Sequence, residues 1–235
     1  MSRKSTYEVS RLFSRGKTCL AKHERGLPQL VAGGRRARGG ERSRQQPFAP
    51  PEDWHEPTGW GAAEYRVVVQ PPGDDFRHVV TPQEIRGRLA SLPGWMLESL
   101  SVIQLSRMTR KKQLSPCYGM QWGQALYLYP IAADFVEQFT RPPLPAQQTE
   151  AKMFGARWKS ASDGTWRLIW TEQAVRDYYL NNVLIHELGH LLDDRNTAYA
   201  DRERYAEWFA IRYGYQPTRS SGSSGRKPVR RHHGK

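Results

Sequence analysis

Short apolar runs separated by turn residues occupy the middle of the chain and predict strands. Runs rich in β-branched residues predict strands at 65–70 and 99–108. Between them, the stretch TPQE at 81–84 combines a capping threonine, a proline at the first helical position and a glutamate placed to complete a capping box. This stretch predicts a helix that starts after Thr81 and runs to about Leu92.

The next part of the chain gives a more ambiguous pattern. Residues 117–131 predict either one long strand or a hairpin folded at Gly123. Residues 132–139 are expected to form a short helix, and the proline-bearing residues 141–149 are expected to form a loop.

A strong hairpin signal follows. The Asp-Gly pair at 163–164 separates two runs that contain apolar and aromatic residues, 154–160 and 165–170. Asp-Gly between two such runs favours a tight β-turn, because glycine adopts the backbone angles that the turn requires. The second run leads directly into the helical part of the chain.

Helical spacing of apolar residues predicts two helices after this hairpin. The first begins at Thr171, a suitable N-cap, and ends near residues 193–194. The second spans 200–213, with Gly214 as its expected C-cap. Strands followed by helices predict an α+β fold, with a small mixed or antiparallel sheet packed on the first of these helices.

The first of these two helices contains His186-Glu187-Leu188-Gly189-His190. Two imidazoles four residues apart on a helix lie about one turn from each other on the same face, so both can reach one ion. Glu187 lies beside that ion, where it can take a proton from the attacking water. This is the H-E-x-x-H pattern of zinc peptidases. The alternative is a buried amphipathic helix whose histidines only form hydrogen bonds.

A catalytic zinc usually takes a third protein ligand. The metzincin pattern does not supply it, because Asn196 stands where that pattern has its third histidine. The second helix offers Glu203 and Glu207, one turn apart on the same face. Either can serve as the ligand, and three aspartates remain as further alternatives. These are Asp193, Asp194 and Asp201.

In its second helix, ERYAEWFA at 203–210, the chain resembles the gluzincins and most of all the ImmA/IrrE family, whose helix follows E-x-x-A-[ND]-x-F-A. The resemblance covers residues 183–213. It implies a zincin-like fold and a Zn²⁺ ion held by His186, His190 and Glu203. Glu207 then takes the place of the Asn/Asp that supports the ligands, although this chain has a glutamate there.

Charge is concentrated at the two ends of the chain. Residues 1–46 contain twelve Lys/Arg and three Glu, and residues 216–235 contain six Lys/Arg and no acid, whereas the overall charge is +13. Low periodicity and many Gly, Pro and Ser residues predict a disordered basic arm at 1–50, a folded metallopeptidase-like domain at 51–215 and a disordered basic tail at 216–235. The basic ends could bind nucleic acid.

These patterns together predict a zinc-dependent endopeptidase that acts on a protein or peptide substrate, with Glu187 as general base. An exposed strand could bind the substrate by strand addition; residues 166–170 are the first candidate and 117–130 the second. The alternative is a nucleic-acid-associated regulatory or scaffold protein with a structural metal site. A missing signal-peptide core and missing membrane-length apolar runs favour a cytoplasmic protein without membrane spans. The sequence does not determine the oligomeric state.

Overall fold

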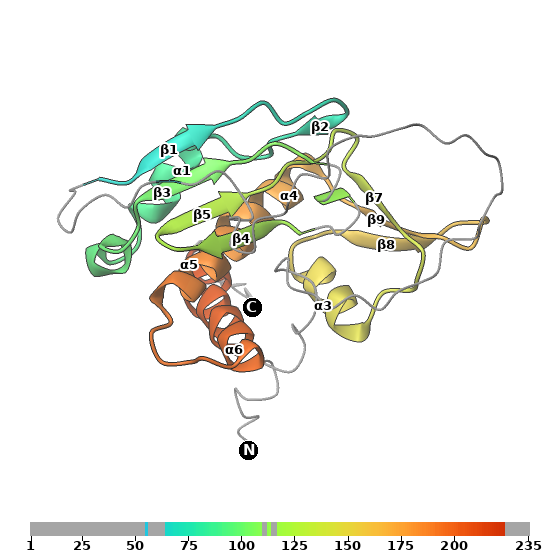
Figure 1. Ribbon diagram of the computed structural model, residues 1–235. Coiled ribbons are helices and arrows are strands. Elements are labelled where there is room, and N and C mark those ends of the chain that lie inside the picture. The colour runs from blue at the N-terminus through green and yellow to red at the C-terminus, as the bar shows by residue number, and fades with distance from the viewer. Residues whose placement is uncertain (1–54, 56–63, 110–111, 114–116, 224–235) are drawn as a thin grey trace, which may run out of the picture.

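The structure is a computed structural model that describes residue 55 and residues 64–109, 112–113 and 117–223 (Figure 1). The arm predicted at 1–50 and residues 224–235 of the predicted tail lie outside these described residues. The described part has an α+β fold, as the sequence predicts.

The largest sheet has four strands in the order β1-β3-β5-β4. Strands β1 (Arg66–Val69), β3 (Val102–Leu105) and β5 (Ala125–Leu128) are mutually parallel, whereas β4 (Gly119–Trp122) runs antiparallel to β5 at one edge. Gly123 connects β4 to β5 with a φ of 58°, an angle that glycine adopts without strain. The stretch 117–131 is therefore a hairpin and not one long strand.

A separate three-stranded antiparallel sheet has the order β7-β9-β8. Strands β8 (Arg157–Ser160) and β9 (Trp166–Ile169) form the hairpin predicted from the Asp-Gly pair. Strand β7 (Val136–Phe139) pairs with the other side of β9. Strands β2 (Phe76–Arg77) and β6 (Ile131–Ala132) form a further antiparallel pair within the described residues.

Two predictions for residues 132–149 are wrong. No helix forms at 132–139, because Phe135 has a φ of 60° and the backbone N–H of Val136 donates to the Asp134 side chain in a turn. The expected loop at 141–149 gives way to helix α3 (Pro145–Met153), whose proline stands in the first turn. Residues 136–139 form a strand because they pair with β9. Residues 145–149 are helical because Pro145 is suited to the first turn of a helix.

Helix α1 (Pro82–Leu89) starts with the predicted capping box, in which the Thr81 hydroxyl accepts from the Glu84 N–H and the Thr81 N–H donates to the Glu84 carboxylate. It ends at Leu89, and a short 3₁₀ turn at Gly94–Leu97 follows. The same Glu84 carboxylate forms an ion pair with Arg176.

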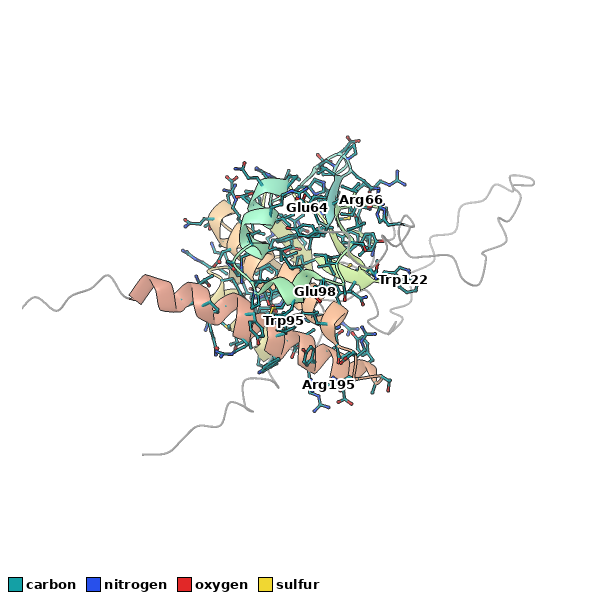
Figure 2. All side chains as sticks on the ribbon, turned by 90° about the vertical axis from the view of Figure 1, so that its left-hand side faces the viewer. Glu64, Arg66, Trp95, Glu98, Trp122 and Arg195 are labelled. Atoms are coloured by element: carbon teal, nitrogen blue, oxygen red, sulfur yellow. The ribbon has the colours of Figure 1, made fainter. Side chains whose placement is uncertain are left out.

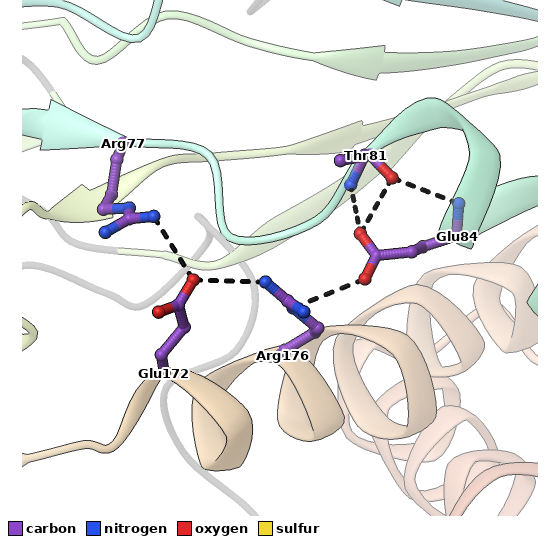
Figure 3. Close-up of polar contacts among 5 residues, drawn as sticks. All are labelled: Arg77, Thr81, Glu84, Glu172 and Arg176. Carbon is purple, nitrogen blue, oxygen red and sulfur yellow. Dashed lines mark hydrogen bonds and ion pairs between the residues drawn. The ribbon is translucent and has the colours of Figure 1, made fainter.

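Figure 3 shows how this ion pair extends to a second acid. Arg176 lies 3.4 Å from Glu84 and 3.1 Å from Glu172, and Glu172 lies 3.4 Å from Arg77. The network links α1, β2 and the helix that begins at Glu172. Because these side chains are partly exposed, each pair contributes at most about 1 kcal/mol.

The predicted helix after Thr171 forms as three continuous segments. Thr171 caps α4 (Glu172–Tyr178) by accepting from the Ala174 N–H. A π-helical turn, η3 (Tyr179–Val183), leads directly into α5 (Leu184–Leu192). Insertions of this kind shift the register of a helix and are frequent at functional sites.

The second C-terminal helix has the same construction but is longer than predicted. Helix α6 (Tyr199–Phe209) passes through a π-helical segment, η4 (Ala210–Tyr215), into α7 (Gln216–Ser223). Gly214 is therefore not a C-cap, and the helix continues past residue 216, where the sequence predicted the tail to start. Instead, Gly214 lets η4 approach η3: a Cβ there would overlap the backbone carbonyl oxygen of Asn181.

The main core lies between the helices and one face of the four-stranded sheet. Leu126 and Leu128 of β5 are buried in one cluster with Leu184 and Leu188 of α5. The opposite face of this sheet carries a smaller buried cluster. Helix α5 contacts β4 and β5 on its sheet side and α6 on its other side. Within the described residues, no helix combines the length and the apolar character that a bilayer crossing requires.

Candidate metal centre

Helices α5 and α6 pack closely enough to share one site. Gly189 permits this approach, since a Cβ at that position would lie 3.0 Å from the Ala206 Cα and 3.0 Å from the Phe209 Cβ. A glycine inside a helix can mark such a close approach, and here helix α6 makes it. Small residues at the crossing therefore bring side chains of the two helices together.

His186, His190 and Glu203 meet at this crossing. The two imidazole Nε2 atoms lie 3.1 Å apart. The Nε2 of His190 lies 3.2 Å from Glu203 Oε1, and the Nε2 of His186 lies 3.7 Å from Glu203 Oε2. All three residues are buried, with 0% of His186, 6% of His190 and 8% of Glu203 exposed.

This spacing suits a metal ion. Ligand atoms about 2.1 Å from a tetrahedral Zn²⁺ lie roughly 3.4 Å from one another, close to the measured separations. Two imidazole nitrogens and one carboxylate oxygen are also donor types that zinc accepts. The three residues thus form a buried group that could bind a metal ion.

The electrostatics of Glu203 are set by the two histidines. Burial alone raises the pKa of Glu203, but hydrogen bonds and charge interactions with His186 and His190 outweigh it and hold that pKa well below its usual range. Glu203 is therefore a carboxylate at neutral pH, which is the form that coordinates a cation.

Glu187 lies between α5 and the edge strand β4. It is 0% exposed, and a Cβ at Gly119 would lie 2.7 Å from both the Cγ and the Oε1 of Glu187. The same Cβ would lie 2.8 Å from the Val183 side chain. Only glycine at position 119 leaves room for the Glu187 carboxylate against the strand.

The other acidic candidates do not join the metal group. Glu207 is buried on α6, with 2% exposed, but it is not part of the group formed by His186, His190 and Glu203. Asp193 accepts hydrogen bonds from the backbone N–H and the side chain of Asn196, so its carboxylate is used in the turn that follows α5. Asp194 is exposed, and Asp201 forms an ion pair with Arg204.

The two candidate substrate strands lie in different environments. The first candidate, at 166–170, forms β9 in the centre of its sheet, with both edges paired, so its assignment as an edge strand is wrong. The second candidate contains β4, which is an edge of the four-stranded sheet and lies beside α5. Trp122, at the end of β4, is 47% exposed (Figure 2).

Sequence reasoning missed two residues of this region, Gly119 and Arg202. Gly119 had a readable signal, because a glycine inside a predicted strand often marks a close backbone approach. Arg202 had no such signal. Its guanidinium reaches residues more than ten positions away in the chain, and only the fold brings them together.

Comparison with protein-family models, with curated proteins and with solved structures finds no match to this chain. The chemistry of the site therefore has to be argued from its own residues. These are two imidazoles, one ionised carboxylate and a second carboxylate held against an edge strand.

Proposed function

We propose that this protein is a zinc-dependent endopeptidase with a zincin-like fold, of the gluzincin type and most similar to the ImmA/IrrE family. The observation that carries the proposal is the buried group of His186, His190 and Glu203 in the same short helix pair as Glu187. A mixed sheet whose antiparallel edge strand lies against α5 supports the zincin-like assignment.

His186, His190 and Glu203 would hold the ion, with the imidazoles neutral and Glu203 ionised. Bound Zn²⁺ supplies Lewis acidity, which lowers the pKa of coordinated water toward about 7 and polarises a carbonyl group. Glu187 accepts the proton of the attacking water as general base and then returns it to the leaving amine.

The edge strand β4 is the proposed binding site for the substrate main chain. An extended peptide that pairs with β4 gains main-chain hydrogen bonds with little dependence on its sequence. Because the Glu187 carboxylate lies against Gly119 of the same strand, the peptide is held beside the general base.

The competing function is a nucleic-acid-associated protein with a structural metal. Structural zinc sites normally use four protein ligands, whereas the group found within the described residues has three members. A structural site also has no use for a carboxylate at position 187. The basic ends remain compatible with nucleic acid binding in either case.

Metal analysis and cleavage of a mixed peptide library by purified variants test the proposal. We expect wild type to bind about one Zn²⁺ per chain, and Glu203→Ala to lose it. Glu187→Gln should keep the metal but lose cleavage by about 10²- to 10⁴-fold, because only the proton transfer is removed.

Glu207→Gln separates the two candidate ligands and should keep the metal. Loss of zinc in Glu207→Gln with retention in Glu203→Ala would reverse the ligand assignment. Cleavage by Glu187→Gln at the wild-type rate would contradict the general-base role.

A further inference from the structure

Arg202 joins the three elements that surround the candidate site. One terminal nitrogen of its guanidinium lies 3.2 Å from the carbonyl oxygen of His190 on α5 and 3.3 Å from the side-chain oxygen of Gln121 on β4. That nitrogen carries two hydrogens, so it can donate to both acceptors. Arg202 itself precedes Glu203 on α6.

The acceptor on α5 is the carbonyl oxygen of His190, which has no hydrogen-bond donor within that helix. Helix α5 ends at Leu192, so the carbonyl of His190 belongs to the last turn, whose carbonyls have no intrahelical donor. A guanidinium at this end also interacts favourably with the helix dipole. Arg202 therefore holds the turn that carries a proposed metal ligand.

The acceptor on β4 lies on the side of the strand that faces the site. Side chains alternate along a strand, so Gln121 points to the same side as Gly119, the position that contacts Glu187. Because Arg202 bonds both Gln121 and His190, it holds the edge strand β4 against α5. The bond to β4 lies two residues along the strand from Gly119, which contacts the proposed general base Glu187.

We propose that Arg202 is a positioning residue that sets the register of α6 against α5 and β4. In this register both histidines and Glu203 converge on one ion. The inference rests on the proposed metal site and does not depend on peptide cleavage, since it concerns the geometry in which this chain binds the metal.

The test measures binding of Zn²⁺ and Co²⁺ alone by full-length variants, in competition with a chelator. Arg202→Met should weaken Zn²⁺ binding about 10- to 100-fold, the range found when a group that orients a ligand is removed. The visible spectrum of bound Co²⁺ should also change, because the ligand geometry changes. Arg202→Lys keeps the charge, but its side chain is one atom shorter and lacks the planar guanidinium, so it should show the same change to a smaller degree.

Two matched variants control for charge and for stability. Arg204→Met removes an arginine from the exposed side of the same helix. Arg176→Met removes two of the ion pairs in Figure 3, neither of which involves a proposed metal ligand. Both should bind the two metals as wild type does. If Arg176→Met weakens binding as much as Arg202→Met, the effect is general destabilisation and the inference is overturned.

Wild-type affinity and an unchanged Co²⁺ spectrum in Arg202→Met would also overturn it. If Arg202→Met does not fold, the same criteria apply to Arg202→Lys. Failure of the wild-type protein to bind either metal would instead contradict the proposed function.

Discussion

Two carboxyl groups in this protein, Glu203 and Glu137, have their pKa values shifted in opposite directions. Both are desolvated, which raises a carboxyl pKa. For Glu203 the two histidines outweigh burial, and its pKa falls. For Glu137 burial outweighs its hydrogen bonds, and its pKa rises above 4.5. Neighbouring groups, and not burial alone, thus decide the direction in which each pKa shifts.

The Glu137 carboxylate accepts two hydrogen bonds at one oxygen, from the Tyr118 hydroxyl and from the Trp170 indole N–H, each at 2.9 Å. The amide oxygen of a glutamine could accept both. Because the folded state holds the Glu137 proton more tightly than the unfolded state does, folding stability falls as pH rises from about 4.5 through the folded pKa.

We therefore expect Glu137→Gln to gain thermal stability relative to wild type as pH rises. Its Tm minus that of wild type should be larger at about pH 8 than at about pH 5, because the variant has no proton to release. Glu98→Gln, which changes an exposed carboxylate (Figure 2), is the control and should show no such difference. If the Tm difference between Glu137→Gln and wild type is the same at both pH values, the raised pKa of Glu137 in the folded protein is contradicted.

At the scale of elements, two π-helical segments influence how α5 and α6 lie relative to each other. Segment η3 leads into α5 and η4 continues from α6, and the two segments pack on each other. Arg88 of α1 donates to the side chain of Asn181 in η3 and to the backbone carbonyl of Tyr213 in η4. Contact between these segments thus sets the position of α5 relative to α6 from outside the site.

Glycine substitutions test this contact. Gly214→Ala should lower the free energy of unfolding by about 2 kcal/mol or more, because the added methyl overlaps the backbone of Asn181, which cannot move aside cheaply. Gly87→Ala is the matched control in α1, where a Cβ meets nothing within 4 Å, and it should stabilise by up to about 1 kcal/mol through helix propensity.

Urea denaturation measures both changes. Equal effects of Gly214→Ala and Gly87→Ala would show that helix propensity, and not the contact between η3 and η4, dominates at position 214.

At the scale of the whole molecule, the metal should couple to folding. The three candidate ligands come from two helices that only the folded chain brings together, so an ion that binds them would stabilise the folded state alone. At a free Zn²⁺ concentration of 100 times its Kd, the gain is about 2.7 kcal/mol. For a chain of this size, that gain corresponds to a rise in Tm of roughly 5–10 °C.

Thermal denaturation with and without Zn²⁺ checks this expectation. His190→Ala, compared with its own metal-free form, should show a much smaller rise because it lacks one ligand. An equal rise in wild type and His190→Ala would place the stabilising ion elsewhere in the protein.

Local signals in the sequence predicted many of the elements. The capping box at Thr81, the N-cap at Thr171 and the Asp-Gly turn at 163–164 act between residues that are close in the chain, and the structure confirms all three. The one-turn spacing of His186 and His190 is also a local signal, because helix geometry alone brings their imidazoles together.

The sequence by itself thus determined the α+β class, most of the helices and strands, and the pair of histidines. Only the tertiary structure decided that Glu203, and not Glu207, meets those histidines, and that β4 is an edge while β9 is central. It also decided that 132–139 contributes a strand and that Gly214 is a contact point. Each of these outcomes depends on packing between segments far apart in the chain, which local spacing and propensity do not encode.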